Sequence, residues 1–192
     1  MQARNWNLHK YLIFTLLISF SLVTIYLFSF QAGKEFRVNT YYADNQRYPE
    51  IAMDKNGNFV ITWESWEQDG SWDGVFAQRF NSKGEAVGTE FQVNTYTENY
   101  QNEPAIVMNK KGNFVITWTS IGQDGASGGV FARRFNRKGK AIGKEFRVNT
   151  YTDKGQNNPA IALDKKGNFV ITWMSDKQDG SGYGIFAKMF KK

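Results

Sequence analysis

The chain is 192 residues long, about the length of one domain, and its 24 Lys and Arg residues outnumber its 18 Asp and Glu residues, giving a formal net charge of +6. It contains no cysteine, and its one histidine, His9, lies near the N-terminus. These counts exclude disulfide frameworks, thiolate zinc sites, cysteine nucleophiles and sites built from several histidines. Aromatic residues make up 16% of the chain, with 18 Gly and only 3 Pro, a composition typical of an all-β protein with many turns.

A long uncharged segment, YLIFTLLISFSLVTIYLFSF, occupies residues 11–30. As a helix it would extend about 30 Å, the thickness of the hydrocarbon layer of a bilayer. The apolar core of a cleaved signal peptide is shorter, about 7–15 residues, and Phe30 is unfavourable in a cleavage site after Ala32. We therefore predict an uncleaved transmembrane signal anchor, with residues 1–10 in the cytoplasm. The rest of the chain would then be membrane-anchored outside the cytoplasm, in the periplasm or at the cell surface. A cleaved signal peptide is the alternative.

The remainder of the chain consists of three copies of one unit. EFRVNTY begins at Glu35, EFQVNTY at Glu90 and EFRVNTY again at Glu145, so the spacing is 55 residues both times. The string GNFVITW recurs unchanged at the same spacing. A register without insertions indicates one supersecondary unit used three times. We assign repeat 1 to residues 34–88, repeat 2 to 89–143 and repeat 3 to 144–192.

Each repeat is predicted to contain four strands, which in repeat 1 are Glu35–Thr40, Ile51–Asp54, Phe59–Ser65 and Val75–Phe80. Pro49 has no N–H to donate and suits the start of the second strand. Asn and Gly residues then suit a tight turn into the third strand. The third strand carries apolar or β-branched side chains on both faces, which is typical of a strand covered on both faces, as in a propeller blade.

The repeated string EFxVNT…PxIAMDxxGNFVITWxSxxQDGSxxGVFAxRFN resembles the tandem β repeats of large bacterial surface and secreted proteins. It is also similar to the blades of propeller lectins such as the Photorhabdus-type fucose-binding lectin. The resemblance covers about residues 34–190. It implies a β-propeller-like fold and a lectin-like, carbohydrate-binding function.

Three blades are fewer than the roughly four to eight of closed propellers and would leave open sheet edges. A partial ring could pair with a second chain as half of a six-bladed homodimer, the first strand of one chain meeting the last strand of the other. Repeat 1 carries 6 basic and 9 acidic residues, net −3, whereas repeats 2 and 3 carry net charges of +3 and +4, which is compatible with such a contact. A β-trefoil, which closes three four-stranded repeats within one chain, is the alternative fold.

The candidate ligand-binding residues recur in every repeat, at the end of the third strand and in the loop after it. An indole face can cover the apolar face of a sugar ring, while amide and carboxylate oxygens accept hydrogen bonds from sugar hydroxyls. The alternative interpretation is structural: the tryptophans fill the space between blades, and Gln-Asp-Gly forms an ordinary turn. The residues are Trp63, Ser65, Gln68 and Asp69 in repeat 1, Trp118, Ser120, Gln123 and Asp124 in repeat 2, and Trp173, Ser175, Gln178 and Asp179 in repeat 3.

Repeat 1 differs from the other copies near this loop, where it alone has Trp66, Trp72, Asp73 and the pair Glu64 and Glu67. Glycoside hydrolysis needs two carboxylates in one cleft, but we expect these differences to be drift on an exposed loop. The turn after Asp54 resembles a calcium loop only superficially, without its glycine offset and terminal Glu, so no metal site and no cofactor are predicted.

These observations predict a membrane-anchored, extracytoplasmic β-repeat binding module, and not an enzyme, that recognises carbohydrate or another surface ligand. The alternative is a protein–protein interaction or assembly scaffold with no small ligand. Nucleic acid is not an expected partner, because Arg133 and Arg134 point to opposite faces of their strand and so form no continuous basic groove.

Overall fold

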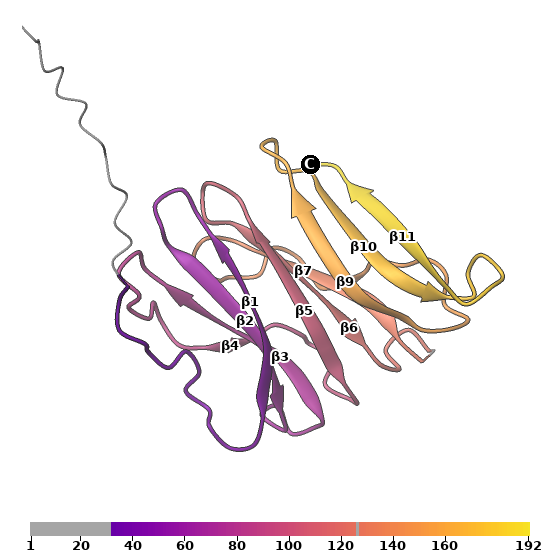
Figure 1. Cartoon of the computed structure of the whole chain (residues 1–192), viewed down its shortest axis with the longest axis horizontal. Coiled ribbons are helices and arrows are strands. Elements are labelled where there is room, and N and C mark those ends of the chain that lie inside the picture. Colours follow the sequence, from indigo (N-terminus) through magenta and orange to yellow (C-terminus); the bar gives the residue numbers. More distant parts are fainter. Residues whose placement is uncertain (1–31, 126) are drawn as a thin grey trace, which may run out of the picture. The chain divides into compact units, whose positions relative to one another are not determined.

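The structure, a computed structural model, describes residues 32–125 and 127–192 (Figure 1). The chain divides into two units, residues 1–35 and 36–192, and every described strand belongs to the second. The predicted cytoplasmic segment 1–10 and the predicted anchor 11–30 lie outside the described residues. Within the ranges that are described, no helix is long and apolar enough to cross a membrane.

Residues 36–192 form three small antiparallel sheets, which confirms the prediction of an all-β fold. The first sheet has the order β1-β2-β3-β4, the second β5-β6-β7-β8 and the third β11-β10-β9. The strands are β1 (Gln46–Met53), β2 (Phe59–Trp66), β3 (Asp73–Phe80), β4 (Phe91–Gln92), β5 (Gln101–Met108), β6 (Phe114–Ser120), β7 (Gly129–Phe135), β8 (Phe146–Arg147), β9 (Gln156–Leu163), β10 (Phe169–Asp176) and β11 (Tyr183–Phe190).

The sheets are out of phase with the sequence repeats. The outer strand of the first sheet, β4, comes from the start of repeat 2, and β8 of the second sheet comes from the start of repeat 3. The predicted strand Glu35–Thr40 is therefore wrong for repeat 1, where this segment pairs with no described strand, and its counterparts shorten to two residues. The reason is that this segment becomes a strand only against the last strand of the preceding repeat.

The first strand of each sheet begins earlier than predicted because it continues through a bulge. In β1 the register against β2 shifts between Arg47 and Glu50, and Tyr48, the residue before Pro49, has a φ of 51°. Glu103 and Asn158 take the same left-handed conformation, at 54° and 52°, before the prolines of β5 and β9. The proline therefore sits inside the strand at a bulge, where its missing N–H costs no ladder hydrogen bond.

The hairpin turns between the first two strands of each sheet are held by one acidic or amide side chain. Asp54 Oδ1 accepts hydrogen bonds from the backbone N–H groups of Asn56 and Asn58, at 2.8 and 3.0 Å. Gly57, with a φ of 81°, adopts the left-handed conformation that the turn requires. Asn109 and Asp164 hold the equivalent turns in the same way. These turns are a local property of the sequence.

Two hydrophobic cores lie between successive sheets, which are stacked face to face across Figure 1. The first core joins Val75, Ala77 and Val93 of the first sheet region to Ile116 and Trp118 of the second sheet. The second joins the second sheet to Ile171 and Trp173 in the same manner. Every residue of β6 is buried, because sheets cover it on both sides. This is the packing expected of adjacent propeller blades, and it does not fit the β-trefoil alternative.

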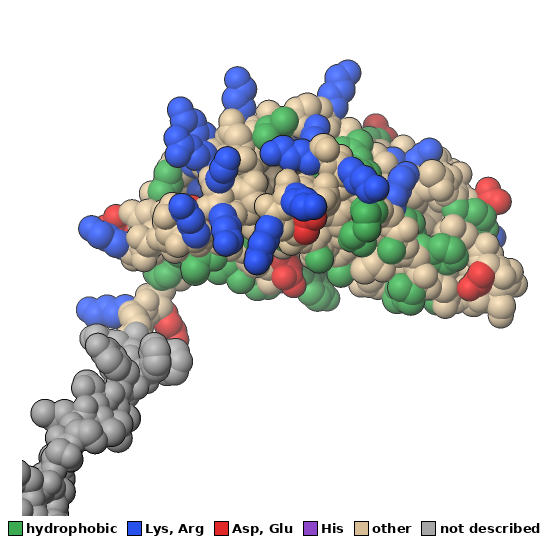
Figure 2. All heavy atoms as spheres, turned by 90° about the horizontal axis from the view of Figure 1, so that it is seen from above, with side chains coloured by type: hydrophobic (Ala, Val, Ile, Leu, Met, Phe, Trp, Pro, Cys, Tyr) green, Lys and Arg blue, Asp and Glu red, His purple; other side chains and the backbone are tan. Residues whose placement is uncertain are grey.

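The end of the sheets that carries the hairpin turns is strongly basic. Figure 2 looks onto this end and shows Lys and Arg side chains gathered there. Lys55, Lys110, Lys111, Arg137 and Lys138 surround a shallow depression of about 480 Å³. The turns follow the C-terminal ends of β1, β5 and β9, so the N-terminal halves of these strands lie at the opposite end of the sheets. The basic charge is therefore concentrated at one end of the inner strands.

Candidate functional site

The three tryptophans predicted to stack on a sugar are buried in the folded chain. Trp63, Trp118 and Trp173 are 3%, 0% and 5% exposed, and the last two belong to the cores between sheets. An indole buried to this degree presents no face to a ligand, so the predicted stacking role is wrong. The structural alternative, that these residues fill the space between blades, agrees with their packing.

The polar members of the predicted sites connect one repeat to the next. Gln68 Nε2 donates to Glu90 Oε1 at 2.7 Å, and Asp69 Oδ2 accepts from Gln92 Nε2 at 2.9 Å. Gln123 makes the equivalent contact with Glu145 at 2.6 Å, and Asn149 Nδ2 donates to Asp124. Asp179 Oδ1 accepts from the Ser181 N–H, while Gln178 is half-buried. Ser65, Ser120 and Ser175 are fully buried. The structure therefore gives the Gln and Asp residues of this motif a role in joining repeat 1 to repeat 2 and repeat 2 to repeat 3.

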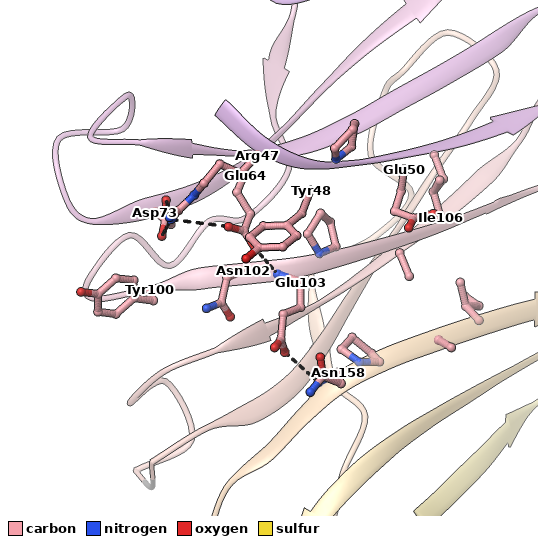
Figure 3. Close-up of a pocket in the computed structure, with 16 residues that line it drawn as sticks. Arg47, Tyr48, Glu50, Glu64, Asp73, Tyr100, Asn102, Glu103, Ile106 and Asn158 are labelled. Atoms are coloured by element: carbon pink, nitrogen blue, oxygen red, sulfur yellow. Dashed lines mark hydrogen bonds and ion pairs between the residues drawn. The ribbon is translucent and has the colours of Figure 1, made fainter. Parts of the chain in front are cut away.

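A different site forms where the first halves of the innermost strands lie side by side. β1, β5 and β9 line an open hollow of about 1030 Å³, shown in Figure 3. The three left-handed residues of the strand bulges, Tyr48, Glu103 and Asn158, all line it. Because each bulge turns its side chain out of the regular pleat, equivalent positions of the three repeats are directed to one surface.

Carboxylates in the hollow connect neighbouring sheets through the bulges. Glu64, on β2, accepts a hydrogen bond from the backbone N–H of Glu103 at 2.6 Å. The Glu103 carboxylate in turn accepts from the backbone N–H of Asn158 and from the Thr119 hydroxyl, both at 2.7 Å. Figure 3 shows this series passing from one sheet to the next. Each carboxylate thus satisfies a backbone donor that the neighbouring bulge removes from its ladder.

Arg47 holds the acidic group together at the edge of the hollow. Its guanidinium lies 2.9 Å from Asp73 Oδ2 and 3.8 Å from Glu64 Oε2. Glu64 is 2% exposed, and burial, with a smaller contribution from the Asp73 charge, raises the pKa of Glu64 to about 7. The Glu103 N–H and Arg47 act in the opposite direction and do not cancel this effect. Glu64 can therefore exchange a proton near neutral pH.

An aromatic cluster adjoins the acidic group. Trp72 lies 5.3 Å from Trp66 and 5.1 Å from Tyr100, measured between ring centroids, and Tyr100 lines the hollow. Trp72 is 47% exposed. Trp66 and Trp72 come from repeat 1 and Tyr100 comes from repeat 2, so the cluster forms only when the two repeats pack together. A partly exposed aromatic surface beside carboxylates and amides is suited to binding a sugar.

Sequence reasoning identified most of these repeat 1 residues but explained them wrongly. Glu64 and Asp73 are 2% exposed, so they are not drift on an exposed loop. The signal in the sequence is their departure from the repeat: Thr119 and Met174 replace Glu64 in the other copies. Within residues 32–125 and 127–192, no group of three or more His, Cys, Asp or Glu side chains is placed to hold a metal ion.

No protein-family model matches this chain, and no curated relative is found. Solved structures do resemble it. A protein of unknown function from Dyadobacter fermentans matches with a TM-score of 0.57 and 13% identity, over 79% of this chain and 39% of that one. The microbial sialidase Hz136 matches with a TM-score of 0.53 and 12% identity, over 76% of this chain and 35% of the sialidase. An endo-arabinase from Bacteroides thetaiotaomicron matches with a TM-score of 0.50 and 15% identity, over 75% of this chain and 55% of the endo-arabinase.

These similarities show a shared all-β fold. The chain spans about a third to a little over half of the length of these three proteins. Two of the three are named as enzymes that act on carbohydrate. At identities of 15% or less, the activity of a neighbour is not carried over to this chain.

Proposed function

We propose that this chain is a propeller-like carbohydrate-binding module whose binding site is the hollow lined by β1, β5 and β9 together with the aromatic cluster that adjoins it at Tyr100. The observation that carries the proposal is the partly exposed aromatic cluster of Trp66, Trp72 and Tyr100 beside Arg47, Asp73 and Asn102. The rings offer a surface for the C–H face of a sugar, and the polar groups offer partners for its hydroxyls. The carbohydrate-related names among the structural neighbours are consistent with this class of ligand.

The charge of the hollow favours a neutral glycan. Four carboxylates, those of Glu50, Glu64, Asp73 and Glu103, line it together with one guanidinium, that of Arg47. An acidic sugar would meet net repulsion there even when Glu64 is protonated, because three carboxylates still outnumber the one guanidinium. The ligand we propose is therefore a hydroxyl-rich, uncharged oligosaccharide.

We propose binding without hydrolysis, because each buried carboxylate has a structural partner. Asp73 accepts two hydrogen bonds from Arg47, and Glu103 accepts from Thr119 and Asn158. Most glycoside hydrolases need one carboxyl group that protonates the leaving group and a second that is available to the sugar or to water. Release of reducing sugar from a bound glycan by the wild-type chain, lost in Glu64→Gln, would contradict this part of the proposal.

The test is glycan-array binding by the full chain in a non-ionic detergent. We expect Trp72→Ala and Tyr100→Ala to abolish or strongly reduce binding of neutral glycans while the β-sheet circular dichroism is retained. Tyr42→Ala is the matched control, because Tyr42 is an aromatic residue that is 77% exposed and belongs neither to the lining of the hollow nor to the aromatic cluster. Binding that is equal in all three variants, or binding confined to acidic glycans, would refute the proposed site.

Membrane attachment remains part of the proposal and is supported by the uncharged sequence of residues 11–30. We expect the chain to fractionate with membranes and the repeats to be cut by protease added from the extracytoplasmic side. Recovery of the full-length chain in the soluble fraction would contradict an uncleaved anchor.

A further inference from the structure

The contact between the start of one repeat and the last strand of the repeat before it occurs twice within this chain. In the first case Phe91 pairs with Ala77 and Gln92 with Phe76, in antiparallel register. The backbone N–H of Val93 donates to the Val75 carbonyl at 2.8 Å, and the Val75 N–H donates to the Asn94 side chain at 2.9 Å.

The second contact, between repeats 2 and 3, repeats this geometry. Phe146 pairs with Ala132, the Val148 N–H donates to the Val130 carbonyl at 2.8 Å, and the Val130 N–H donates to Asn149 Oδ1 at 2.8 Å. The contact is therefore a defined joint between an EFxVN segment and a β-strand edge.

The equivalent strand edge in repeat 3 is open among the described residues. β11 is the outer strand of its sheet, and its position corresponding to Val75 and Val130 is Ile185. Val75 and Val130 are 0% exposed, whereas Ile185 is 73% exposed. Tyr183 and Met189, on the same face of β11, are each 62% exposed. An apolar strand edge of this length invites pairing with another strand.

The complementary segment is present at the other end of the folded unit. Phe36–Asn39 has the same sequence, FRVN, as the segment that forms β8 and the two residues after it, yet it pairs with no described strand. It is already held in the manner of its counterparts. The ring centroids of Phe36 and Phe80 lie 5.4 Å apart, and those of the counterparts Phe91 and Phe135 lie 5.6 Å apart. The Thr40 N–H donates a hydrogen bond to Glu90 Oε2 at 2.6 Å. Little ordering is therefore needed before it can pair.

The face of the first sheet beside this segment is also uncovered. Ile51 and Met53 of β1 are each 57% exposed, whereas their counterparts in β5, Ile106 and Met108, pack in the first core. The exposed face of the first sheet and the exposed edge of β11 are thus the two sides of an interface that the chain forms twice internally. The net charge of repeat 1 is −3 and that of repeat 3 is +4, so the two ends attract each other.

We propose that the outer edge of β11 binds residues Phe36–Asn39 of a second copy of this chain, with Ala187 opposite Phe36 and Phe186 opposite Arg37. The occupant is identified by its sequence and by its preformed position. The contact is heterologous, because the two sides are different surfaces, and two copies that each contribute both sides close into a pair. The pairing does not depend on what the hollow binds.

The mass of the full chain in non-ionic detergent tests the pairing. We expect the wild type to have the mass of two 22.0 kDa chains, and Ile185→Asp to have the mass of one, because the aspartate would be buried at the joint. Ile142→Asp is the matched control: Ile142 is 42% exposed and lies outside β11, so this variant should remain paired. A wild type with the mass of one chain, or an Ile185→Asp variant that stays paired, would overturn the proposal. A series of larger multiples would overturn the closed pair.

Cross-linking identifies the residues in contact, since the chain has no cysteine of its own. Chains carrying Phe36→Cys and chains carrying Ala187→Cys are mixed, allowed to exchange and oxidised. Directly opposed residues of an antiparallel pair lie about 5.5 Å or less apart at Cα, within the range for a disulfide. We expect a disulfide between the two variants and none when Ala187→Cys is mixed with Lys83→Cys. Failure of the first mixture to cross-link would contradict the register. Formation of the disulfide would show that the two chains meet at β11 and not only through residues 11–30.

Discussion

Glu64 gives the folded chain a stability that depends on pH in the neutral range. Its carboxyl group is enclosed between β2 and the bulge of β5, and burial raises its pKa from 4.5 to about 7. The folded chain therefore binds a proton more tightly than the unfolded chain between these two values. Because the protonated form is favoured by folding, the free energy of unfolding falls as pH rises from about 4.5 to 7 and stays low above that. Glu64→Gln removes this titration.

The size of the effect follows from the shift. Each pKa unit corresponds to about 1.4 kcal/mol, so a change from 4.5 to about 7 gives at most about 3 kcal/mol between pH 4.5 and pH 8. We expect Glu64→Gln to be more stable than the wild type at pH 8 and to show a much flatter pH profile. Burial also raises the pKa of Asp69, which adds a slope of the same sign to the profiles of both proteins.

The assay is urea unfolding of the full chain in detergent at pH 5, 6, 7 and 8, followed by tryptophan fluorescence. Glu67→Gln is the matched control, since Glu67 lies three residues further along the chain and is exposed, and it should retain the wild-type profile. A wild-type stability that is constant across these pH values, or a Glu64→Gln variant with the wild-type slope, would refute the argument from burial.

Two further predictions concern the core and the turns. Trp118→Ala should lower the free energy of unfolding by about 3–5 kcal/mol, because Trp118 is 0% exposed between two sheets. Trp72→Ala should lower it by less than half as much, because Trp72 is 47% exposed. Urea unfolding measures both, and equal losses of stability would contradict the assignment of Trp118 to the core. Asp54→Ala should lower the free energy of unfolding by about 1 kcal/mol, because the turn loses its side-chain hydrogen-bond acceptor. Asp54→Asn should leave the free energy of unfolding nearly unchanged, because Asn109 already holds the equivalent turn. Thermal unfolding of the two Asp54 variants checks this, and equal melting temperatures would contradict the role of the side chain.

The repeat, the all-β class and the hairpin turns could be predicted because each depends on local sequence. Turn residues such as Asn56 and Gly57 act on their own neighbours, and the apolar or β-branched side chains on both faces of β2 indicate that both faces are covered. The extra length of β1 could not be predicted, because it depends on a left-handed Tyr48 before Pro49 that is stabilised by pairing with β2. The sequence also does not predict that β4 and β8, which begin repeats 2 and 3, complete the sheet of the preceding repeat. Strand pairing between repeats is not encoded within one repeat.

For the site, the sequence indicated the residue types but not their surroundings. Trp63 and Trp72 are both tryptophans near the same loop, yet one is 3% exposed and the other 47%. Only the packing of the first sheet against the second separates a core side chain from one that a sugar can reach. The acidic group was hidden for the same reason: Glu64 and Glu103 are 39 residues apart and meet across two repeats.

The sequence by itself determined that one unit is used three times and that the middle strand of each unit is covered on both faces, because periodicity and side-chain alternation are properties of the chain order. The tertiary structure alone decided which strand completes which sheet, which aromatic residues remain exposed and which carboxylate is buried. These depend on contacts between residues far apart in the chain, whose energies exist only once the sheets have packed against each other.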